Sequence, residues 1–233
     1  MRVIVLLKQV PDPGQIGVSR TKGTLFEKGK RILNPADEHV LELAAELKSK
    51  EQADFVALAS GPEPVVEVLR RAYAFGADQC YHLVEELDEG DHFAKARALA
   101  GAIRLIAKER GEVDLVLAGK GSPAWGAGQT GARIAAELEL PQALWVAKLR
   151  VHGRELEATQ LAGGEEQVRR VPMPALVTVD PSANKPRIPN ALLLMKAFKR
   201  EVKKLGLEEL GLTPDAFAAG STQVRIVRTY APD

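Results

Sequence analysis

The stretch that decides the fold is Val113-Asp-Leu-Val-Leu-Ala-Gly-Lys-Gly-Ser-Pro-Ala-Trp-Gly-Ala-Gly-Gln-Thr-Gly-Ala-Arg-Ile-Ala-Ala-Glu-Leu138. Its first part, Val113–Ala118, is short and apolar, which predicts a strand buried on both faces. Its last part predicts a helix packed on a sheet, because apolar or small residues recur at i, i+3, i+4 and i+7: Gly131, Ile134, Ala135 and Leu138. The glycine-rich turn between them predicts an anion site, since glycine allows close backbone approach and a helix start presents unpaired N–H groups. We expect the ligand bound there to be a phosphate group.

The motif content of this turn narrows the chemistry. Gly119, Gly121 and Ala124 match the G-x-G-x-x-A fingerprint, but that fingerprint belongs to the first strand-helix turn of a unit, so a merely flexible connection remains an alternative. The run Gly128–Gly131 favours phosphate, because Thr130 can both cap the helix and donate a hydrogen bond. No Walker lysine-serine pair follows a glycine here, which disfavours NTP hydrolysis.

Composition indicates a soluble globular protein. The chain has 233 residues, of which 45% are hydrophobic and 27% charged. The formal net charge of +1 disfavours a nucleic-acid partner. A single cysteine fits a reducing compartment, and the sequence shows neither an apolar run long enough to span a membrane nor a signal peptide. The expected location is the cytoplasm.

Strand-like and helix-like segments alternate through the first half of the chain. The expected strands are Arg2–Leu7, Asp54–Ala59, Gln79–Val84 and Val113–Ala118. This alternation predicts an α/β fold with a doubly wound, Rossmann-like, mostly parallel sheet. Ligands bind at the carboxyl ends of such strands, so Leu6, Ser60 and Gly119 are expected to converge on one ligand.

The segment between the first strand and the first helix is rich in turn residues. Lys8–Gly17 is expected to be a loop, and Thr24–Phe26 with Arg31–Leu33 a hairpin or a pair of extended segments. Asn34 is a candidate N-cap, and Pro35 suits the first position of a helix that runs to about residue 48. Along this helix an acidic ridge is expected to face solvent: Glu38, Glu42 and Glu46.

The second half changes pattern. Four strand-like segments are expected to complete the sheet with antiparallel strands: Ala143–Leu149, Glu155–Leu161, Gln167–Val171 and Ala175–Val179. An apolar and basic helix is expected from about Ala191 to Lys204. The strand-like Val224–Val227 in the tail has no evident place in the same sheet.

Reactive constellations are not evident. The four histidines lack the spacing of a zinc motif, so no metal site is expected. Cys80 lies within an expected strand, where a buried, inert thiol is favoured over a nucleophile. Ser122 lacks the glycine of a hydrolase elbow, and Trp125 could either stack on a base or cover the sheet edge. The chain is expected to bind a nucleotide without reacting with it.

Several segments together resemble one family, the β subunit of electron transfer flavoprotein. They keep the family's order over nearly the whole chain: Val3–Pro13, Asn34–Glu38, Gly76–Asp78, Val113–Gly131, Gly163–Glu166, Asn184–Arg187 and Met195–Ala197. The resemblance implies an electron carrier, not an enzyme, that forms a heterodimer with an α subunit bearing most of the FAD site. It also implies that this chain holds AMP in a structural role. Carried over position by position, the AMP contacts are Leu6, Asn34, Pro35, Ala36, Asp37, Ser60, Gly119, Lys120, Gly121, Ser122, Gly128, Gln129 and Thr130.

The resemblance further implies docking surfaces. Glu166 matches a glutamate that faces the mobile flavin domain. The segment that meets other proteins includes Ala191, Leu192, Leu193, Met195 and Lys196. The implied partners are flavin-dependent dehydrogenases such as acyl-CoA dehydrogenase, and transiently a membrane quinone oxidoreductase. The expected organisation is a nucleotide-binding domain over 1–184, a docking loop and helix over 185–204, and an arm over 205–233 that packs on the α subunit.

Two departures and two alternatives accompany the resemblance. Pro123–Gly126 stands where many relatives carry acidic residues, and Ala191 stands where they carry a leucine anchor, a role we expect Leu192 to take over. One alternative is a bifurcating flavoprotein that holds a second FAD at the AMP site. The other is a stand-alone ATP-binding protein of the same fold.

Overall fold

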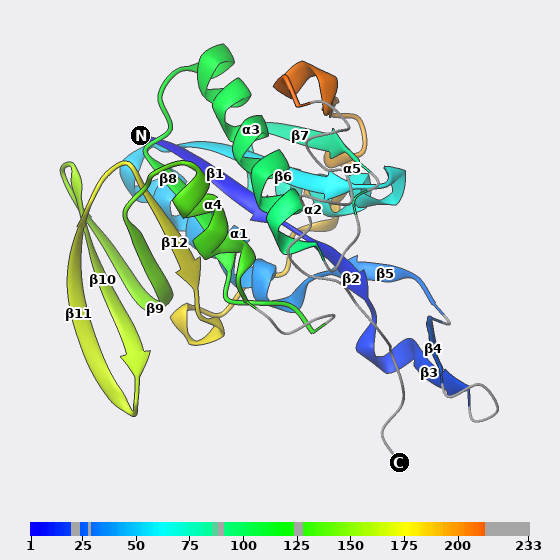
Figure 1. Ribbon diagram of the computed structural model, residues 1–233, viewed down its shortest axis with the longest axis horizontal. Coiled ribbons are helices and arrows are strands. Elements are labelled where there is room, and N and C mark those ends of the chain that lie inside the picture. Colours follow the sequence, from blue (N-terminus) through cyan, green and yellow to red (C-terminus); the bar gives the residue numbers. More distant parts are fainter. Residues whose placement is uncertain (20–23, 28, 86, 88–90, 124–127, 213–233) are drawn as a thin grey trace.

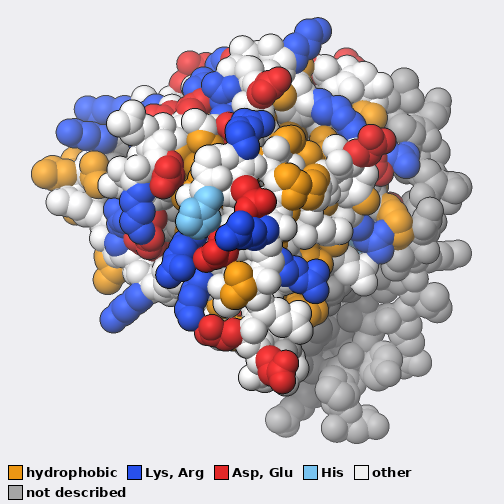
Figure 2. Space-filling view, turned by 90° about the vertical axis from the view of Figure 1, so that its left-hand side faces the viewer, with side chains coloured by type: hydrophobic (Ala, Val, Ile, Leu, Met, Phe, Trp, Pro, Cys, Tyr) orange, Lys and Arg blue, Asp and Glu red, His pale blue; other side chains and the backbone are white. Residues whose placement is uncertain are grey.

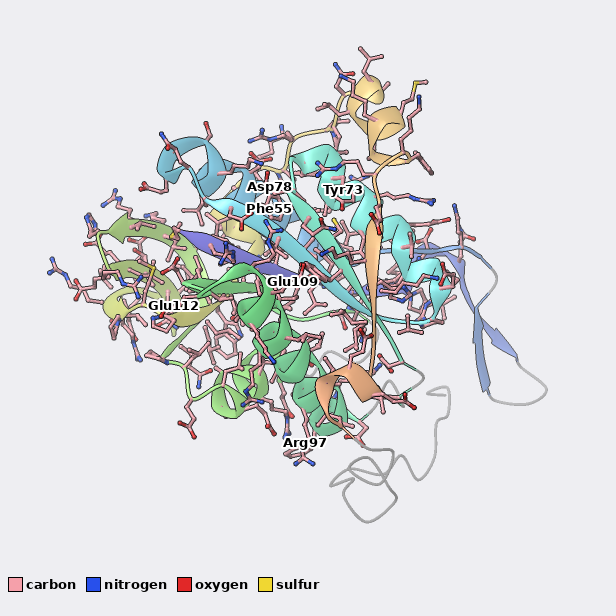
Figure 3. The ribbon with its side chains drawn as sticks, turned by 90° about the horizontal axis from the view of Figure 1, so that it is seen from above. Phe55, Tyr73, Asp78, Arg97, Glu109 and Glu112 are labelled. Atoms are coloured by element: carbon pink, nitrogen blue, oxygen red, sulfur yellow. The ribbon has the colours of Figure 1, made fainter. Side chains whose placement is uncertain are left out.

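A computed structural model describes residues 1–19, 24–27, 29–85, 87, 91–123 and 128–212. Its centre is a nine-stranded sheet with the order β11-β10-β9-β12-β8-β1-β6-β7-β13. Helices cover both faces, which gives three layers: α1, α2 and α5 on one side, α3 and α4 on the other (Figure 3). Among the described residues, no helix is both long and apolar enough to cross a bilayer.

The inner strands are parallel and buried on both faces, as predicted. They are β1 (Arg2–Leu7), β6 (Asp54–Gly61), β7 (Gln79–Val84) and β8 (Leu115–Gly119). Along β1, Val3 and Val5 pack with α1 (Pro35–Glu51) and α2 (Val66–Phe75). Ile4 and Leu6 pack with α3 (His92–Arg110) and α4 (Thr130–Glu137) on the opposite face. The doubly wound fold is therefore confirmed, and its strand order reverses between β1 and β8.

Two helices end or begin at residues that suit these positions. Gly76 ends α2 with a φ of +106°, a conformation that glycine adopts without strain. Asp91 begins α3, and its carboxylate accepts a hydrogen bond of 2.9 Å from the backbone N–H of Ala94. Cys80 is fully buried, as predicted, and burial raises the pKa of its thiol.

The second half of the chain adds both kinds of pairing. Its strands are β9 (Gln142–His152), β10 (Glu155–Ala162), β11 (Glu165–Pro172) and β12 (Ala175–Val179). β10 pairs antiparallel with β9 and β11, whereas β12 inserts between β8 and β9 and runs parallel to both. The expectation of antiparallel strands is thus confirmed for β10 and β11 and wrong for β12, while β9 has one antiparallel and one parallel neighbour. Every residue of β12 is buried, which suits a central strand, while β11 is mostly exposed at the sheet edge.

The β9–β11 ribbon forms one end of the molecule, and the β3–β4 arm extends from the opposite side (Figure 1). On the face seen in Figure 2, basic and acidic side chains are interspersed. Three ion pairs cross the ribbon: Lys148–Glu166, Arg150–Glu157 and Arg170–Glu155.

The segment after β1 contains more regular structure than predicted. Lys8–Gly17 includes β2 (Gln9–Pro11), a short 3-10 helix (Pro13–Gln15) and the start of β3 (Ile16–Ser19). β4 (Thr24–Glu27) and β5 (Arg31–Leu33) are extended, but they do not pair with each other. Instead β2 pairs with β5 and β3 with β4, so the hairpin reading is wrong. Prolines lack the N–H that a ladder needs, and they fall at the boundary between the two ribbons.

The C-terminal segment also differs from the prediction. Helix α5 (Ala191–Ala197) is short, and β13 (Val202–Gly206) follows it parallel to β7. A helix to Lys204 is therefore wrong, because residues 202–206 cover the open edge of β7 instead and bury Leu205. A 3-10 turn, Glu208–Leu210, then contacts α3 at Gly101. Val224–Val227 lies outside the described residues, as do 124–127.

Candidate functional site

A cavity of about 400 Å³ opens at the carboxyl edge of the sheet, where the strand order reverses between β1 and β8. Such a switch point is where doubly wound sheets bind ligands. Nine of the predicted contact residues line the cavity: Leu6, Asn34, Asp37, Ser60, Gly119, Gly121, Ser122, Gly128 and Thr130. Residues far apart in the sequence are thus brought together at the predicted place.

The other four predicted contact residues do not line the cavity. The Lys120 ammonium lies 2.7 Å from an Asp180 carboxylate oxygen and 5.7 Å from the centre of the Trp145 ring. The exposed Gln129 side chain accepts a 2.7 Å hydrogen bond from Arg133. Pro35 and Ala36 form the first turn of α1. The side chains of Lys120 and Gln129 are therefore engaged away from the cavity.

The start of α4 lies in the cavity wall, at the predicted anion site. Thr130 and Gly131, the first two residues of this helix, both line the cavity. The first turn of a helix carries unpaired N–H groups and the positive end of the helix dipole. The prediction that Thr130 caps the helix is wrong, because the N-cap position belongs to Gln129, whose side chain makes no capping hydrogen bond.

Glycine is required at three positions of this segment, by backbone conformation at one and by close contacts at the others. Gly128 has a φ of +59°, and a Cβ there would lie 2.9 Å from the Lys120 carbonyl oxygen. A Cβ on Gly119 would lie 2.3 Å from Oδ1 of Asp37, and one on Gly131 would lie 2.7 Å from Cγ2 of Thr178. Close ligand approach was the expected reason for Gly119, but a contact inside the protein requires this glycine. Gly131 packs on the sheet, as predicted from its place on the apolar face of the helix.

A buried pair at the start of α1 holds the cavity wall. Asn34 occupies the N-cap position, but its side chain does not cap; Nδ2 donates to Oδ1 of Asp37 at 2.8 Å and to the Gly121 carbonyl at 2.9 Å. Oδ2 of Asp37 accepts from the backbone N–H of Lys8 at 2.7 Å. The two side chains therefore connect the end of β1 to the glycine-rich turn, in addition to lining the cavity.

Burial dominates the electrostatics of Asp37. It raises the pKa of this carboxyl to about 7, although hydrogen bonds from Lys8, Asn34 and Gly119 oppose the rise. The site therefore contains an acid that titrates near neutral pH at the junction of β1, β8 and α1.

The opposite wall of the cavity was missed by sequence reasoning. Glu85, at the end of β7, is buried and forms a 2.8 Å ion pair with Lys95 of α3. His92 lies beside them, and burial, with Lys8 and Arg133, lowers its pKa. The rule that placed Leu6, Ser60 and Gly119 also applies to the end of β7, so Glu85 could have been found from that signal. Among the described residues, no group of three or more His, Cys, Asp or Glu is placed to hold a metal.

The predicted docking residues of α5 are exposed. Leu192 is 64% and Met195 67% exposed, and Ala191, Leu193 and Lys196 are also exposed. Glu166 lies on β11, at the opposite end of the sheet order from β13, which follows α5. The structure therefore places Glu166 and the docking residues of α5 apart.

Comparison with known proteins gives a consistent relationship. The sequence model of the electron transfer flavoprotein domain matches residues 22–210. The β subunit of electron transfer flavoprotein from Thermoanaerobacterium thermosaccharolyticum is 30% identical over 236 residues, covering 100% of this chain and 89% of the relative. The caffeyl-CoA reductase-Etf complex subunit CarD of Acetobacterium woodii is 30% identical, with 100% and 88% covered. Protein FixA of Bradyrhizobium diazoefficiens is 33% identical, with 100% and 83% covered. The chain therefore belongs to the electron transfer flavoprotein family, among its β subunits.

Proposed function

We propose that this chain holds AMP in the cavity between β1 and β8 and supports an FAD-bearing α subunit. In this role it helps to carry electrons from flavin-dependent dehydrogenases to a membrane quinone oxidoreductase. The observation that carries the proposal is a cavity at the switch point with the start of α4 in its wall. Its volume of about 400 Å³ suits a small ligand. The helix start suits a phosphate group, and Leu6 and Leu7 provide apolar surface for a base.

AMP is expected to stabilise the protein without being consumed. At a hundred times its Kd, a ligand adds about 2.7 kcal/mol to the free energy of unfolding. For a chain of this size, that corresponds to a rise in Tm of about 5–10 °C. The test is a thermal shift with AMP on nucleotide-depleted protein. Gly128→Val combined with Thr130→Val should remove most of the shift.

Gly163→Val is the matched control. Gly163 has a φ of +61°, close to that of Gly128, but lies in the turn between β10 and β11. The Gly163→Val variant should introduce similar backbone strain, and AMP should still raise its Tm by the same amount. If AMP gives no shift in the unmodified protein, the structural role for AMP is refuted.

FAD at the same site is a second candidate. Leu87 and Leu99 also line this cavity, and they add apolar surface to that of Leu6 and Leu7. A flavin-to-protein ratio of two per heterodimer, with a thermal shift by FAD and none by AMP, would establish this alternative; a ratio of one supports AMP. ATP hydrolysis by the isolated chain would instead support the stand-alone ATP-binding protein.

The partnership with an α subunit is tested by co-expression. The chain expressed with an α subunit should give a yellow one-to-one complex, whereas the chain alone should be colourless and poorly behaved. A stable monomer that carries its own FAD would contradict the proposed division of the flavin site.

Docking of the dehydrogenase is assigned to the exposed face of α5. Leu192→Ala in the heterodimer should weaken electron uptake several-fold, because an exposed apolar anchor contributes affinity without supporting the core. FAD content and Tm should stay unchanged. Val168→Ala, at a residue 61% exposed on β11, is the control and should have no effect. A loss of about 2–5 kcal/mol of stability in Leu192→Ala would identify a core residue and refute the assignment.

A further inference from the structure

The segment that leads into α5 is tied to α1 by a buried carboxylate. Glu42, in the middle of α1, is 6% exposed, so the expected acidic ridge is solvated only in part. Its Oε2 accepts hydrogen bonds from the backbone N–H of Arg187 at 2.9 Å and from Nε at 2.8 Å. Its Oε1 accepts from Nη2 of Arg187 at 2.6 Å. One carboxylate therefore fixes both the main chain and the guanidinium of Arg187.

A second link lies three residues earlier. Nδ2 of Asn184 donates to the backbone carbonyl of His39 at 2.9 Å, and His39 Nδ1 lies 3.1 Å from the Asn184 carbonyl oxygen. His39 and Glu42 are three positions apart, so they lie on the same side of α1. The chain from Asn184 to Arg187 is thus held along this side of the helix.

The chain after α5 is anchored as well. The guanidinium of Arg200 donates to the carbonyls of Ala77 at 3.0 Å and Asp78 at 2.5 Å, and lies 4.2 Å from the centre of the Tyr73 ring. Tyr73 and Asp78 are labelled in Figure 3 on the side of the sheet that carries α5. The Phe198 ring also lies 4.8 Å from the Arg70 guanidinium. The chain is therefore held by specific contacts both before and after helix α5.

Helix α5 lies against α2, but few of its own side chains are buried. It has seven residues, and an isolated helix of that length is not stable in water. Only Ala197 is buried in the core beneath it, with Leu194 partly buried against the same cluster. The orientation of the exposed face therefore depends on the anchors on either side.

We propose that Glu42 and Arg187 are positioning residues for dehydrogenase docking, because they hold α5 in the orientation that presents Leu192 and Met195 to the partner. The proposal rests on the docking function assigned above to α5. An arginine fork bound to a carboxylate fixes direction as well as distance, which a lysine ammonium does not. Of the two partners, Glu42 is the buried one, so its fixed position in α1 sets the position of Arg187.

The test uses Arg187→Lys in the FAD-loaded heterodimer. This substitution keeps the positive charge but removes the two-pronged guanidinium contact with Glu42. The KM of the dehydrogenase for the heterodimer should rise several-fold, by no more than Leu192→Ala itself produces, because Arg187 acts only through the orientation of that anchor. The limiting rate at saturating heterodimer and the FAD content should not change, because the flavin is not touched.

Arg71→Lys is the matched control. Arg71 forms a 2.7 Å pair with Glu38, which also lies on α1, but this pair does not contact residues 184–187. The control should leave the KM unchanged. If Arg187→Lys does not assemble with an α subunit, Glu42→Gln provides the same measurement, since it keeps the shape of the side chain and removes its charge.

The double variant Arg187→Lys with Leu192→Ala separates positioning from general stability. If Arg187 acts through α5, the double variant should have nearly the same KM as Leu192→Ala alone, because the effects of coupled residues are not additive. A fall in Tm with unchanged KM in Arg187→Lys, or full additivity with Leu192→Ala, would overturn the positioning role. If Leu192→Ala alone is silent, the docking function itself fails, and the two failures are thereby distinguished.

Discussion

Asp37→Asn should change how stability depends on pH. Burial, opposed by hydrogen bonds from Lys8, Asn34 and Gly119, raises the pKa of Asp37 from 3.8 to about 7. Between these two values the folded protein holds a proton on Asp37 and the unfolded chain does not, so stability falls as pH rises through this window and levels off above pH 7. Each pH unit is worth about 1.4 kcal/mol, so the whole window corresponds to at most about 4 kcal/mol.

Asparagine does not titrate, so the variant lacks this slope. It should carry a constant penalty of about 1–3 kcal/mol, because its amide NH₂ replaces an acceptor that faces N–H donors. The slope acts over the two pH units from 5 to 7 and ends above that. The difference in free energy of unfolding between the unmodified protein and the variant should therefore shrink by about 3 kcal/mol between pH 5 and pH 8.

The assay is calorimetric unfolding of the unmodified and variant heterodimers at pH 5, 6, 7 and 8 and constant ionic strength. At about 2 °C per kcal/mol, the difference in Tm should close by about 5 °C across this range. Asp54→Asn is the control: although burial opposes the effect, Arg2 and Arg110 lower the pKa of Asp54 overall, which places its titration below the range tested. Parallel profiles for the unmodified protein and Asp37→Asn would refute the reasoning, because they would show that Asp37 is ionised throughout.

Three further substitutions are tested by denaturant unfolding, two at the cavity and one at the end of α2. Gly119→Ala should cost about 1–3 kcal/mol, because the new Cβ would lie 2.3 Å from Oδ1 of Asp37; adding Asp37→Ala should recover part of that loss. Glu85→Ala should cost about 3–5 kcal/mol, because it leaves the Lys95 ammonium unpaired in the cavity wall, and the double variant Glu85→Ala with Lys95→Met should cost less. Gly76→Ala should cost about 1 kcal/mol from its φ of +106° alone, since a Cβ there meets no atom within 4 Å; a neutral result would show that the end of α2 relaxes.

The parallel core and the position of the cavity could be predicted from the sequence. Apolar runs such as Arg2–Leu7 indicate buried strands, and their carboxyl ends must meet at one edge of a parallel sheet. That reasoning placed Leu6, Ser60 and Gly119 around the same cavity. It depends on periodicity, which is a local property of the sequence, and on the alternation of strands with helices, which indicates parallel strands.

Partnerships between distant side chains could not be predicted in this way. Glu42 has the spacing of a solvated residue on α1, and only the arrival of Arg187, distant in the chain, makes its position a buried one. Asn34 has the identity of a helix cap, but its NH₂ group donates to Asp37 and to the Gly121 carbonyl, and its side chain makes no capping hydrogen bond. The short α5 was overestimated for the same reason, since the open edge of β7 recruits Val202–Gly206 as a strand.

The place of β12 sets the order in which the cavity between β1 and β8 can be completed during synthesis. The Val179 carbonyl accepts the hydrogen bond from the N–H of Lys120, and Thr178 packs on Gly131, so both the glycine-rich turn and α4 rest on residues made some fifty positions later. Until the ribosome has released residue 180, β8 lacks one of its two neighbouring strands. The start of α4 then also lacks the β12 side chains against which it packs. A ligand of this cavity would therefore bind only after the early steps of folding. Its binding would favour chains in which β12 has already paired with β8, a contact that depends on long-range closure of the chain.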